Sequence, residues 1–291
     1  MYPLLRSNTS FDAVIVADGS FPTHEMPLSI LQAARTIICC DAAAAQVLAA
    51  GLRPTAVVGD GDSLADELKE ALAARWHQID EQEYNDLTKA MRHARSLGCR
   101  RVAILGATGK REDHTLGNIF LLPFYLDALG MEPTMLTDYG YFVPACGNAT
   151  FATEPAQTVS LFNLTCRTFT ATGLQWKAYP FTQLWQGTLN RATAQCVSVE
   201  ADGQYLVYRS YYRGKQGPRC TSVVQGVECF TYSLPQPVLA ESKRTSHHQA
   251  SHSLPQPTTV QQRANNETRR NSKGKCLGFR KKTPVLRACL F

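Results

Sequence analysis

The sequence lacks the long apolar runs that mark membrane-spanning helices. No stretch approaches the roughly 18 uninterrupted apolar residues that such a helix requires. Residues 1–6 contain no basic region followed by a long apolar one, so we expect no secretory signal peptide. We therefore predict a protein without a membrane partner.

Paired cysteines are absent as well. The chain has 10 cysteines, none of them in a Cys-x-x-Cys pair, and Cys39 and Cys40 are adjacent within an apolar run. This pattern indicates neither a disulfide framework nor a zinc site. Scattered thiols are typical of a reducing compartment, where a buried cysteine acts as a small hydrophobic residue. We therefore expect a cytoplasmic protein.

Positive charge is scarce in most of the chain and is concentrated near its end. Residues 1–212 contain 16 Lys/Arg and 21 Asp/Glu, whereas residues 213–291 contain 14 Lys/Arg and 3 Asp/Glu. The end segment repeats Ser-Leu-Pro-Gln-Pro at 233–237 and 253–257. This composition cannot bury enough apolar surface to offset the cost of ordering, so we predict that 213–291 is a disordered basic tail. Two interpretations stay open: an arm for nucleic acid or another acidic surface, and a non-native extension.

Short apolar segments alternate with helical patterns over the first 140 residues. Near-continuous apolar strands that alternate with helices are typical of a parallel sheet with helices on both faces. We therefore assign residues 1–140 to an α/β domain. Its predicted strands are 13–17, 36–39, 55–58, 76–79, 101–105 and 134–137, and its predicted helices are 28–34, 41–50, 63–74, 85–97 and 113–129.

The carboxyl ends of these strands are the expected ligand-binding edge, as in other open α/β sheets. Polar or glycine residues follow five of the predicted strands closely. We expect them to line one edge of the sheet; they are Asp18, Asp41, Asp60, Gln82 and Gly106.

The pattern changes after Tyr139 to short strands separated by turn residues. We assign residues 141–212 to a small antiparallel β-sandwich domain. Asp202-Gly203 separates two alternating segments and predicts a hairpin with a two-residue type I′ turn. The strands expected here are 141–144, 149–153, 157–163, 166–171, 195–200 and 204–211.

An acidic cluster, Val58-Gly59-Asp60-Gly61-Asp62-Ser63, follows the third predicted strand. Its two carboxylates are two residues apart, and the glycines allow a tight turn that directs both side chains outward. Carboxylate oxygens suit Mg²⁺, which proteins usually hold jointly with substrate phosphates. An ordinary Asp/Gly turn has the same composition.

A second polar set spans residues 82–90. Asn85 or Asp86 can cap the helix that begins here, because either side chain can accept hydrogen bonds from free backbone N–H groups. Asp86 and Lys89 are three residues apart and share a helix face. A carboxylate for a metal or a hydroxyl, beside an ammonium for phosphate, suits phosphoryl transfer.

A third polar set, residues 105–118, runs from a strand through a Gly-rich turn into a helix. Its exposed backbone N–H groups and helix start predict an anion site, although the spacing from Gly106 to Lys110 is not that of a P-loop. Arg111 can bind phosphate in a bidentate way, and Asp113 can either hold a metal or cap the helix. We interpret His114 as a structural hydrogen-bonding residue rather than a base.

The three sets place carboxylates and cations together at strand-to-helix transitions on one predicted sheet edge. The chemistry they indicate is Mg²⁺-assisted transfer from a nucleoside triphosphate, in which positioning and charge neutralisation provide most of the rate. The carboxylates are Asp60, Asp62, Asp86 and Asp113, and the cations are Lys89 and Arg111.

These motifs resemble those of the bacterial thiamine pyrophosphokinase family, in the same order and with similar spacing from residue 11 to about 211. The tail has no counterpart. The matching segments are Asp41-Ala42-Ala43-Ala44, the acidic cluster at 58–63, Asn85-Asp86-Leu87-Thr88-Lys89-Ala90, Gly106 through Asn118, Gly173-Leu174-Gln175-Trp176 and Gly187-Thr188-Leu189-Asn190.

The resemblance implies a homodimer with its active site in a cleft between subunits. It also implies an enzyme that converts ATP and thiamine to AMP and thiamine diphosphate. Asp60, Asp62 and Asp86 would coordinate Mg²⁺, with Asp113 close by, and Asp86 or Asp62 would accept the hydroxyl proton. ATP would be bound by Asp41, Lys89, Gly106, Thr108 and Arg111. Gln82 and Asn190 would contact thiamine, Asn190 from either subunit.

Three positions depart from the family pattern. Gly61 stands where Phe is common, which removes an apolar wall near the metal. Leu189 replaces a frequent Ser before Asn190, and Asp18 occupies a strand end where Asn is often seen. None of these changes removes an expected metal ligand.

Two other functions are compatible with parts of the sequence. The same architecture would serve another Mg²⁺-dependent phosphotransferase or a nucleotide hydrolase, because fold alone does not fix the substrate. A nucleotide- or nucleic-acid-binding protein that acts through the basic tail is a different class of alternative. The clustered carboxylates disfavour nucleic acid as a partner.

Overall fold

A computed structural model of the chain describes residues 1–61 and 65–213, with no side-chain description for 212 and 213. Asp62 and the tail from residue 214 lie outside the described residues, as does the prediction of tail disorder. Within the described part, no helix is long and apolar enough to cross a membrane.

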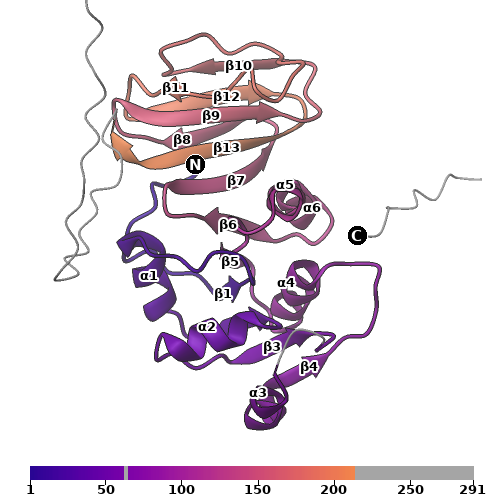
Figure 1. The fold of residues 1–291 in the computed structure, drawn as a ribbon. Helices are drawn as coiled ribbons and strands as arrows, with labels where there is room; N and C mark the ends of the chain where they lie inside the picture. Colours follow the sequence, from indigo (N-terminus) through magenta and orange to yellow (C-terminus); the bar gives the residue numbers. More distant parts are fainter. Residues whose placement is uncertain (62–64, 214–291) are drawn as a thin grey trace, which may run out of the picture. The chain divides into compact units, whose positions relative to one another are not determined.

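One ten-stranded sheet runs through both predicted domains in the order β11-β9-β13-β7-β6-β5-β1-β2-β3-β4 (Figure 1). The six strands from β4 to β6 are parallel, and β6 pairs antiparallel with β7. The parallel strands are β1 (Ala13–Val16), β2 (Ile37–Cys40), β3 (Ala56–Gly59), β4 (Trp76–Gln78), β5 (Arg101–Leu105) and β6 (Glu132–Leu136). The antiparallel strands are β7 (Gly140–Cys146), β9 (Gln157–Asn163), β11 (Asn190–Arg191) and β13 (Gln204–Arg213).

Helices cover both faces of the parallel strands, as predicted. Alternate strand residues belong to two separate apolar clusters: Val14 and Val16 join Ile30 and Val47, whereas Ile15 joins other helices. One face is thus packed by α1 (Glu25–Gln32) and α2 (Ala43–Ala49), and the other by α4 (Asp86–Ser96) and α6 (Leu122–Asp127). The remaining helical elements are α3 (Asp66–Ala71), the 3₁₀ turn η1 (Ala73–Arg75) and α5 (Glu112–Phe120).

A second sheet of three strands, β10-β12-β8, completes a β-sandwich over the antiparallel strands. Its strands are β8 (Ala149–Ala152), β10 (Phe169–Thr172) and β12 (Cys196–Ala201). Phe151, Phe169 and Val197 share an apolar cluster with β13 residues. The ring of Phe169 meets Tyr205 edge-on, with centroids 5.2 Å apart. The predicted small β-sandwich is therefore confirmed, and the sheet is continuous across the boundary expected at 140.

The predicted hairpin around Asp202-Gly203 is wrong. β12 pairs with β8 and β10, whereas β13 pairs with β7 and β9, so the turn carries the chain from one sheet of the sandwich to the other. The Asp202 carboxylate accepts hydrogen bonds from the backbone N–H groups of Arg167 (2.8 Å) and Thr168 (2.9 Å). Alternating strands around a short turn have the same sequence pattern in both arrangements.

Two smaller differences concern elements that the sequence pattern misplaced. The helix expected over 113–129 is two helices, α5 and α6, with Pro123 in the first turn of α6. Proline has no N–H to continue the α5 hydrogen bonds, so a new helix starts there. The two-residue strand β11 was not predicted, because it is too short to show alternation.

Candidate active site

A cavity of about 320 Å³ opens at the carboxyl ends of the parallel strands, where the sequence placed the ligand edge. It is lined by residues that follow β1, β2 and β5 and by the first turns of α4 and α5. The lining includes Asp18, Gly19, Asp41, Asn85, Asp86, Gly106, Thr108, Lys110, Arg111 and His114. Asp18 was expected at this edge, and the resemblance assigned roles to five others: Asp41, Asp86, Gly106, Thr108 and Arg111.

Two backbone loops in direct contact form one wall of this cavity. The N–H of Gly19 donates to the carbonyl of Gly106 at 2.6 Å, and the N–H of Ser20 donates to Thr108 at 2.8 Å. A Cβ at Gly19 would lie 2.3 Å from the Gly106 carbonyl oxygen, so only glycine permits this approach. Gly106 has a positive φ of 63°, which also favours glycine. The sequence motif identified Gly106 but missed Gly19, whose role depends on a loop from another strand.

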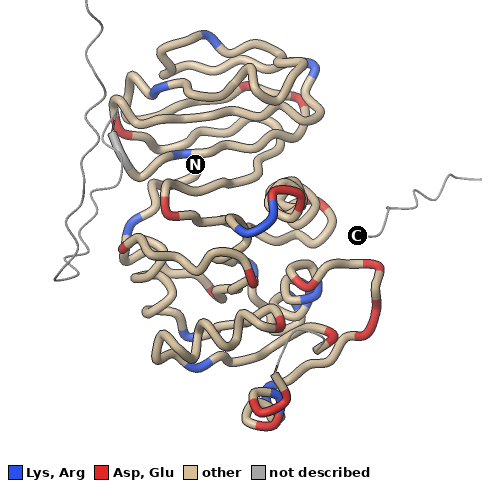
Figure 2. The backbone as a smooth tube through the Cα atoms, viewed as in Figure 1, with Lys and Arg blue, Asp and Glu red and all other residues tan. Residues whose placement is uncertain are grey.

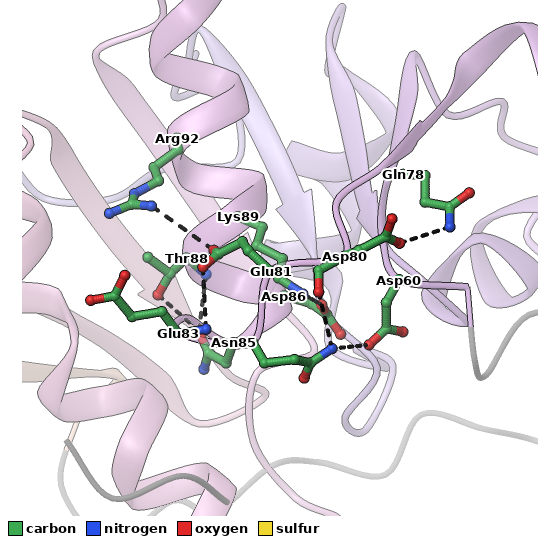
Figure 3. Close-up of polar contacts among 11 residues, drawn as sticks. Asp60, Gln78, Asp80, Glu81, Glu83, Asn85, Asp86, Thr88, Lys89 and Arg92 are labelled. Carbon is green, nitrogen blue, oxygen red and sulfur yellow. Dashed lines mark hydrogen bonds and ion pairs between the residues drawn. The ribbon is translucent and has the colours of Figure 1, made fainter. Parts of the chain in front are cut away.

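Asn85, not Asp86, caps α4. The Asn85 side-chain oxygen accepts hydrogen bonds from the N–H (3.0 Å) and the hydroxyl (2.8 Å) of Thr88. The Asp86 carboxylate instead forms an ion pair with Lys89, whose Nζ lies 3.2 Å from Asp86 Oδ1 (Figure 3). The side chain of Lys89 is 3% exposed and that of Asp86 is 37% exposed. The ammonium therefore lies beneath the carboxylate and is not among the groups that line the cavity.

Asp60 follows β3 directly and contacts Gln82 from the loop before α4. Gln82 Nε2 lies 3.3 Å from Asp60 Oδ2. Nearby, Gln78 Nε2 donates to Asp80 Oδ1 at 2.7 Å (Figure 3). Figure 2 shows that acidic residues gather in this β4–α4 loop and in α3. The two candidates from separate motifs, Asp60 and Gln82, are thus brought together by the fold.

Arg111 and Asp113 form an exposed ion pair at the start of α5. Arg111 Nη2 lies 2.5 Å from Asp113 Oδ2, and Nε lies 3.1 Å from Oδ1, with side-chain exposures of 64% and 59%. The hydrogen bond from Arg111 lowers the pKa of Asp113. Asp113 is not the N-cap residue, because Arg111 occupies that position, but its Oδ1 accepts a hydrogen bond from the first-turn N–H of His114 at 2.9 Å. A phosphate at this site would compete with Asp113 for the guanidinium.

Lys110 is a second cation of the cavity, and its role was not assigned from the sequence. Its Nζ lies 3.0 Å from Asp18 Oδ1, which also accepts a hydrogen bond from Gln46 Nε2 at 2.8 Å. Asp18 therefore orients Lys110 at the cavity. A basic residue next to Arg111 was the available signal, but its partner lies 92 residues away in sequence.

A tryptophan from another element lies beside Gly61, close to where a side chain at that position would begin. Gly61 has a φ of 87°, and a Cβ there would lie 3.1 Å from Cζ2 of Trp76. Trp76 begins β4, which pairs with β3. The indole of Trp76 thus lies next to the space that a side chain at position 61 would enter.

Carboxylates at this edge have the chemistry that Mg²⁺ prefers. Within residues 1–61 and 65–213, no three Asp, Glu, His or Cys side chains lie close enough to hold a metal ion. Asp60 and Asp86 both lie at the carboxyl edge of the sheet. Asp62, the remaining predicted ligand, lies outside the described residues, so its contribution stays a prediction.

Asn190 is buried in the β-sandwich and its side chain is occupied by backbone groups. Its Oδ1 accepts from the N–H of Trp176 (3.1 Å) and Arg191 (2.8 Å), and its Nδ2 donates to the Trp176 carbonyl (2.8 Å). The exposed fraction of Asn190 is 5%, and that of Trp176 is 52%. Asn190 thus holds the segment that presents Trp176 to solvent.

The structure is an α/β domain with an appended β-sandwich and a cavity lined by glycines, carboxylates and cations at the carboxyl edge of its sheet, as in enzymes of the α/β class. Residues 28–128 match the family model of the thiamin pyrophosphokinase catalytic domain. Residues 140–208 match that of the thiamin pyrophosphokinase substrate-binding domain. The chain belongs to the thiamin pyrophosphokinase family and has the thiamine diphosphokinase function of that family.

Solved structures confirm the fold. The chain is similar to thiamine pyrophosphokinase from Bacillus subtilis, with 20% identity, a TM-score of 0.58, and coverage of 69% of this chain and 99% of that one. It is also similar to the enzyme from Candida albicans, with 15% identity, a TM-score of 0.56, and coverage of 72% and 95%. The yeast enzyme has 14% identity, a TM-score of 0.59, and coverage of 72% and 90%. A search of curated protein sequences gives no significant match.

Proposed function

We propose that the donor is ATP and that the reaction takes place at the carboxyl-edge cavity with Mg²⁺. The observation that supports this proposal most strongly is the meeting of Gly106 and Arg111, from the loop between β5 and α5, with Asp86 of α4 at one cavity. Backbone donors, a guanidinium and a carboxylate are the groups that phosphoryl transfer requires. ATP, Mg²⁺ and the roles of individual residues below are all part of this proposal.

The nucleotide would lie against the wall formed by the loops after β1 and β5. Backbone N–H groups at Gly106 and Thr108 and the side chains of Lys110 and Arg111 would neutralise phosphate charge. We place Asp41 beside the nucleotide, because it lines the same cavity at the end of β2. Lys89 is a positioning residue in this arrangement: buried under Asp86, it would fix that carboxylate rather than bind phosphate.

Asp60, Asp62 and Asp86 would hold Mg²⁺, which when bound neutralises and orients the triphosphate. The hydroxyl oxygen of thiamine would form a bond to the β-phosphorus, and the bond between that phosphorus and the α,β-bridging oxygen would break. AMP would leave with the electron pair of that bond, and the hydroxyl proton would pass to Asp86 or Asp62. Gln82, held on Asp60, would contact thiamine beside the metal ligands.

The thiamine site would be completed by the β-sandwich of a second copy. Five large apolar side chains in the segment before β11 are exposed; they are Trp176, Tyr179, Leu184, Trp185 and Leu189. Aromatic residues in such a patch are typical of protein interfaces, so we propose that a homodimer covers it. Asn190 would act by holding Trp176 in place and not through free polar atoms. A cytoplasmic location is supported by the six free cysteines within the described residues.

A product analysis tests the reaction. Purified protein would be incubated with ATP, MgCl₂ and thiamine, and the products would be separated by chromatography. We expect AMP and thiamine diphosphate in equal amounts and no turnover when EDTA removes Mg²⁺. ADP, or ATP consumption that does not depend on thiamine, would instead support the phosphotransferase or hydrolase alternatives.

A substitution tests the metal assignment. Asp62→Asn should lower kcat by roughly a hundredfold or more, because one metal ligand loses its charge. The midpoint of thermal unfolding should stay within a few degrees of wild type. Near-normal turnover of this variant would show that Asp62 is not a metal ligand.

A further inference from the structure

Arg209 is a buried cation without a charged partner in the part of the chain that the structure describes. It lies on β13 with 1% of its surface exposed. Its Nη1 donates to the carbonyls of Ala152 (2.8 Å) and Tyr2 (3.3 Å), and its guanidinium lies 4.8 Å from the ring centre of Tyr141. Its Nε has no hydrogen-bond partner there. A buried guanidinium normally pairs with an anion, because desolvation without one is costly.

Arg209 also lines a second cavity, of about 310 Å³. Other walls come from the chain start (Leu4 and Leu5), from Phe11 before β1, and from Val143 of β7. This cavity shares no lining residue with the active-site cavity. Arg101, at the start of β5, lines it, whereas Gly106, just after the end of that strand, lines the active site. The two cavities therefore lie at opposite ends of the parallel strands.

The polar groups of this second cavity favour a negatively charged ligand. Tyr141 accepts a hydrogen bond from the N–H of Leu5 at 3.2 Å, which leaves its own hydroxyl hydrogen to donate. Glu132, the one acidic residue in the lining, has an ion pair with Arg100 at 3.0 Å. Burial lowers the pKa of Arg209, yet a guanidinium stays charged at neutral pH. The charged donors among the lining side chains are thus Arg209 and Arg101, and Tyr141 adds a hydroxyl.

We propose that this cavity binds a small organic acid, with its carboxylate on Arg209 and Tyr141 and an aliphatic or aromatic body against Leu4, Leu5 and Phe11. A guanidinium and a carboxylate form strong, geometrically matched hydrogen bonds. A neutral ligand would leave Arg209 uncompensated, and a free phosphate would leave the apolar walls unfilled. The site is independent of the nucleotide and thiamine sites proposed above.

Calorimetric titration of the full-length protein with matched probes tests this proposal. The probes are 3-phenylpropionate and its uncharged analogue 3-phenylpropan-1-ol, each titrated with ATP and MgCl₂ present to occupy the active site. We expect saturable binding of the acid and affinity for the alcohol at least roughly tenfold lower. Arg209→Met should weaken acid binding by at least roughly tenfold. Arg95→Met, a change at an exposed arginine of α4 that lines neither cavity, should not alter it.

A second variant keeps the test decisive if Arg209→Met fails to fold. Leu126 is half-exposed and lines the cavity without contributing charge. Leu126→Trp should fill part of the space and weaken acid binding by at least roughly tenfold, while turnover of ATP and thiamine stays unchanged. Equal binding of acid and alcohol, or wild-type acid affinity in Leu126→Trp, would overturn the proposal. Binding of the acid only when ATP is left out would also overturn it, because the acid would then occupy the active site.

Discussion

At the scale of single residues, Gly61 shows how a missing side chain can be compensated from elsewhere. Position 61 lies in the left-handed region, and the indole of Trp76 occupies the space a side chain would need. Gly51 has a similar φ of 76°, but a Cβ there would meet nothing within 4 Å. The same substitution at the two positions therefore separates the energetic cost of backbone strain from the cost of crowding against Trp76.

We predict that Gly61→Phe destabilises the protein, even though Phe is common at this position in the family. Strain at positive φ and displacement of Trp76 should together cost about 2–4 kcal/mol. Gly51→Phe should introduce only the backbone strain at positive φ and should lower the free energy of unfolding by about 1–2 kcal/mol. Urea unfolding followed by circular dichroism would measure both values. Equal losses would show that Trp76 does not occupy the space at position 61.

The buried Lys89 is the second feature at this scale. Asp86 and Lys89 form an ion pair in which the ammonium is almost inaccessible, whereas Asp66 and Lys69 form the same i,i+3 pair at the surface. Removing one partner of a buried pair leaves the other charge without compensation. Exposed pairs contribute little, because water and salt screen them.

We predict a clear coupling energy between Asp86 and Lys89 in a double-mutant cycle. Asp86→Asn and Lys89→Met, singly and together, should give about 1–2 kcal/mol of coupling in the free energy of unfolding, reduced by the partial exposure of Asp86. The matched cycle with Asp66→Asn and Lys69→Met should give less than about 0.5 kcal/mol. Equal coupling energies in the two cycles would show that burial of Lys89 does not strengthen its interaction with Asp86.

At the scale of elements, the start of α1 depends on a residue more than a hundred positions away. Asp138, in the turn between β6 and β7, accepts hydrogen bonds from the N–H of Thr23 (2.9 Å) and the N–H of His24 (3.0 Å). Burial would raise the pKa of Asp138, but these hydrogen bonds and that of the Thr23 hydroxyl outweigh it and lower the pKa. The charged carboxylate thus ties the segment before α1 to the sheet.

We predict that this contact makes stability depend on pH in the acidic range. A carboxylate whose pKa is lowered by folding contributes stability above its unfolded pKa, and this contribution is lost as pH falls through the folded value. Between about pH 5 and pH 2, wild type should therefore lose more unfolding free energy than Asp138→Asn does. Asp127→Asn, at an exposed residue ending α6, is the control and should follow wild type. Identical curves for all three proteins would contradict the role of Asp138.

At the scale of the whole molecule, the β-sandwich exposes several large apolar side chains in the segment before β11. Trp185 is 70% exposed and Leu189 is 75% exposed. Both lie near β11, where Asn190 fixes the segment that carries Trp176. A partner that covers this patch would remove a large apolar area from water.

We predict that Trp185→Lys shifts the protein from dimer to monomer in sedimentation equilibrium, because a charge would be placed in the apolar interface. The dissociation constant should rise by roughly a hundredfold. Leu97→Lys, at a comparably exposed apolar residue after α4, should leave the dimer intact. A wild-type protein that sediments as a monomer would refute the homodimer without affecting the fold.

Most of the α/β fold was predictable because its signals are local. Apolar runs such as Ala13–Val16 and Arg101–Leu105 mark buried parallel strands wherever they pair, and Asn85 marks the start of α4. The Asp202-Gly203 turn was misassigned because partner choice is not local: the same alternation serves a hairpin or a crossing between sheets. Gly19, Lys110 and Trp76 were missed for the same reason, since each acts on a distant segment.

The sequence by itself determined most of the strands and helices along the chain, except β11 and the division of α5 from α6. It also determined the glycines and charged residues at the strand ends and the family to which these motifs belong. The tertiary structure alone decided which of those residues meet. The side chains of Asp60 and Gln82 contact each other, and Lys89 is buried beneath Asp86. The side-chain amide of Asn190 is hydrogen-bonded to the backbone of Trp176. It also left Arg209 in a cavity without a counter-charge among the described residues. The physical reason is that backbone preferences act over a few neighbours, whereas burial and charge pairing depend on segments that only folding brings together.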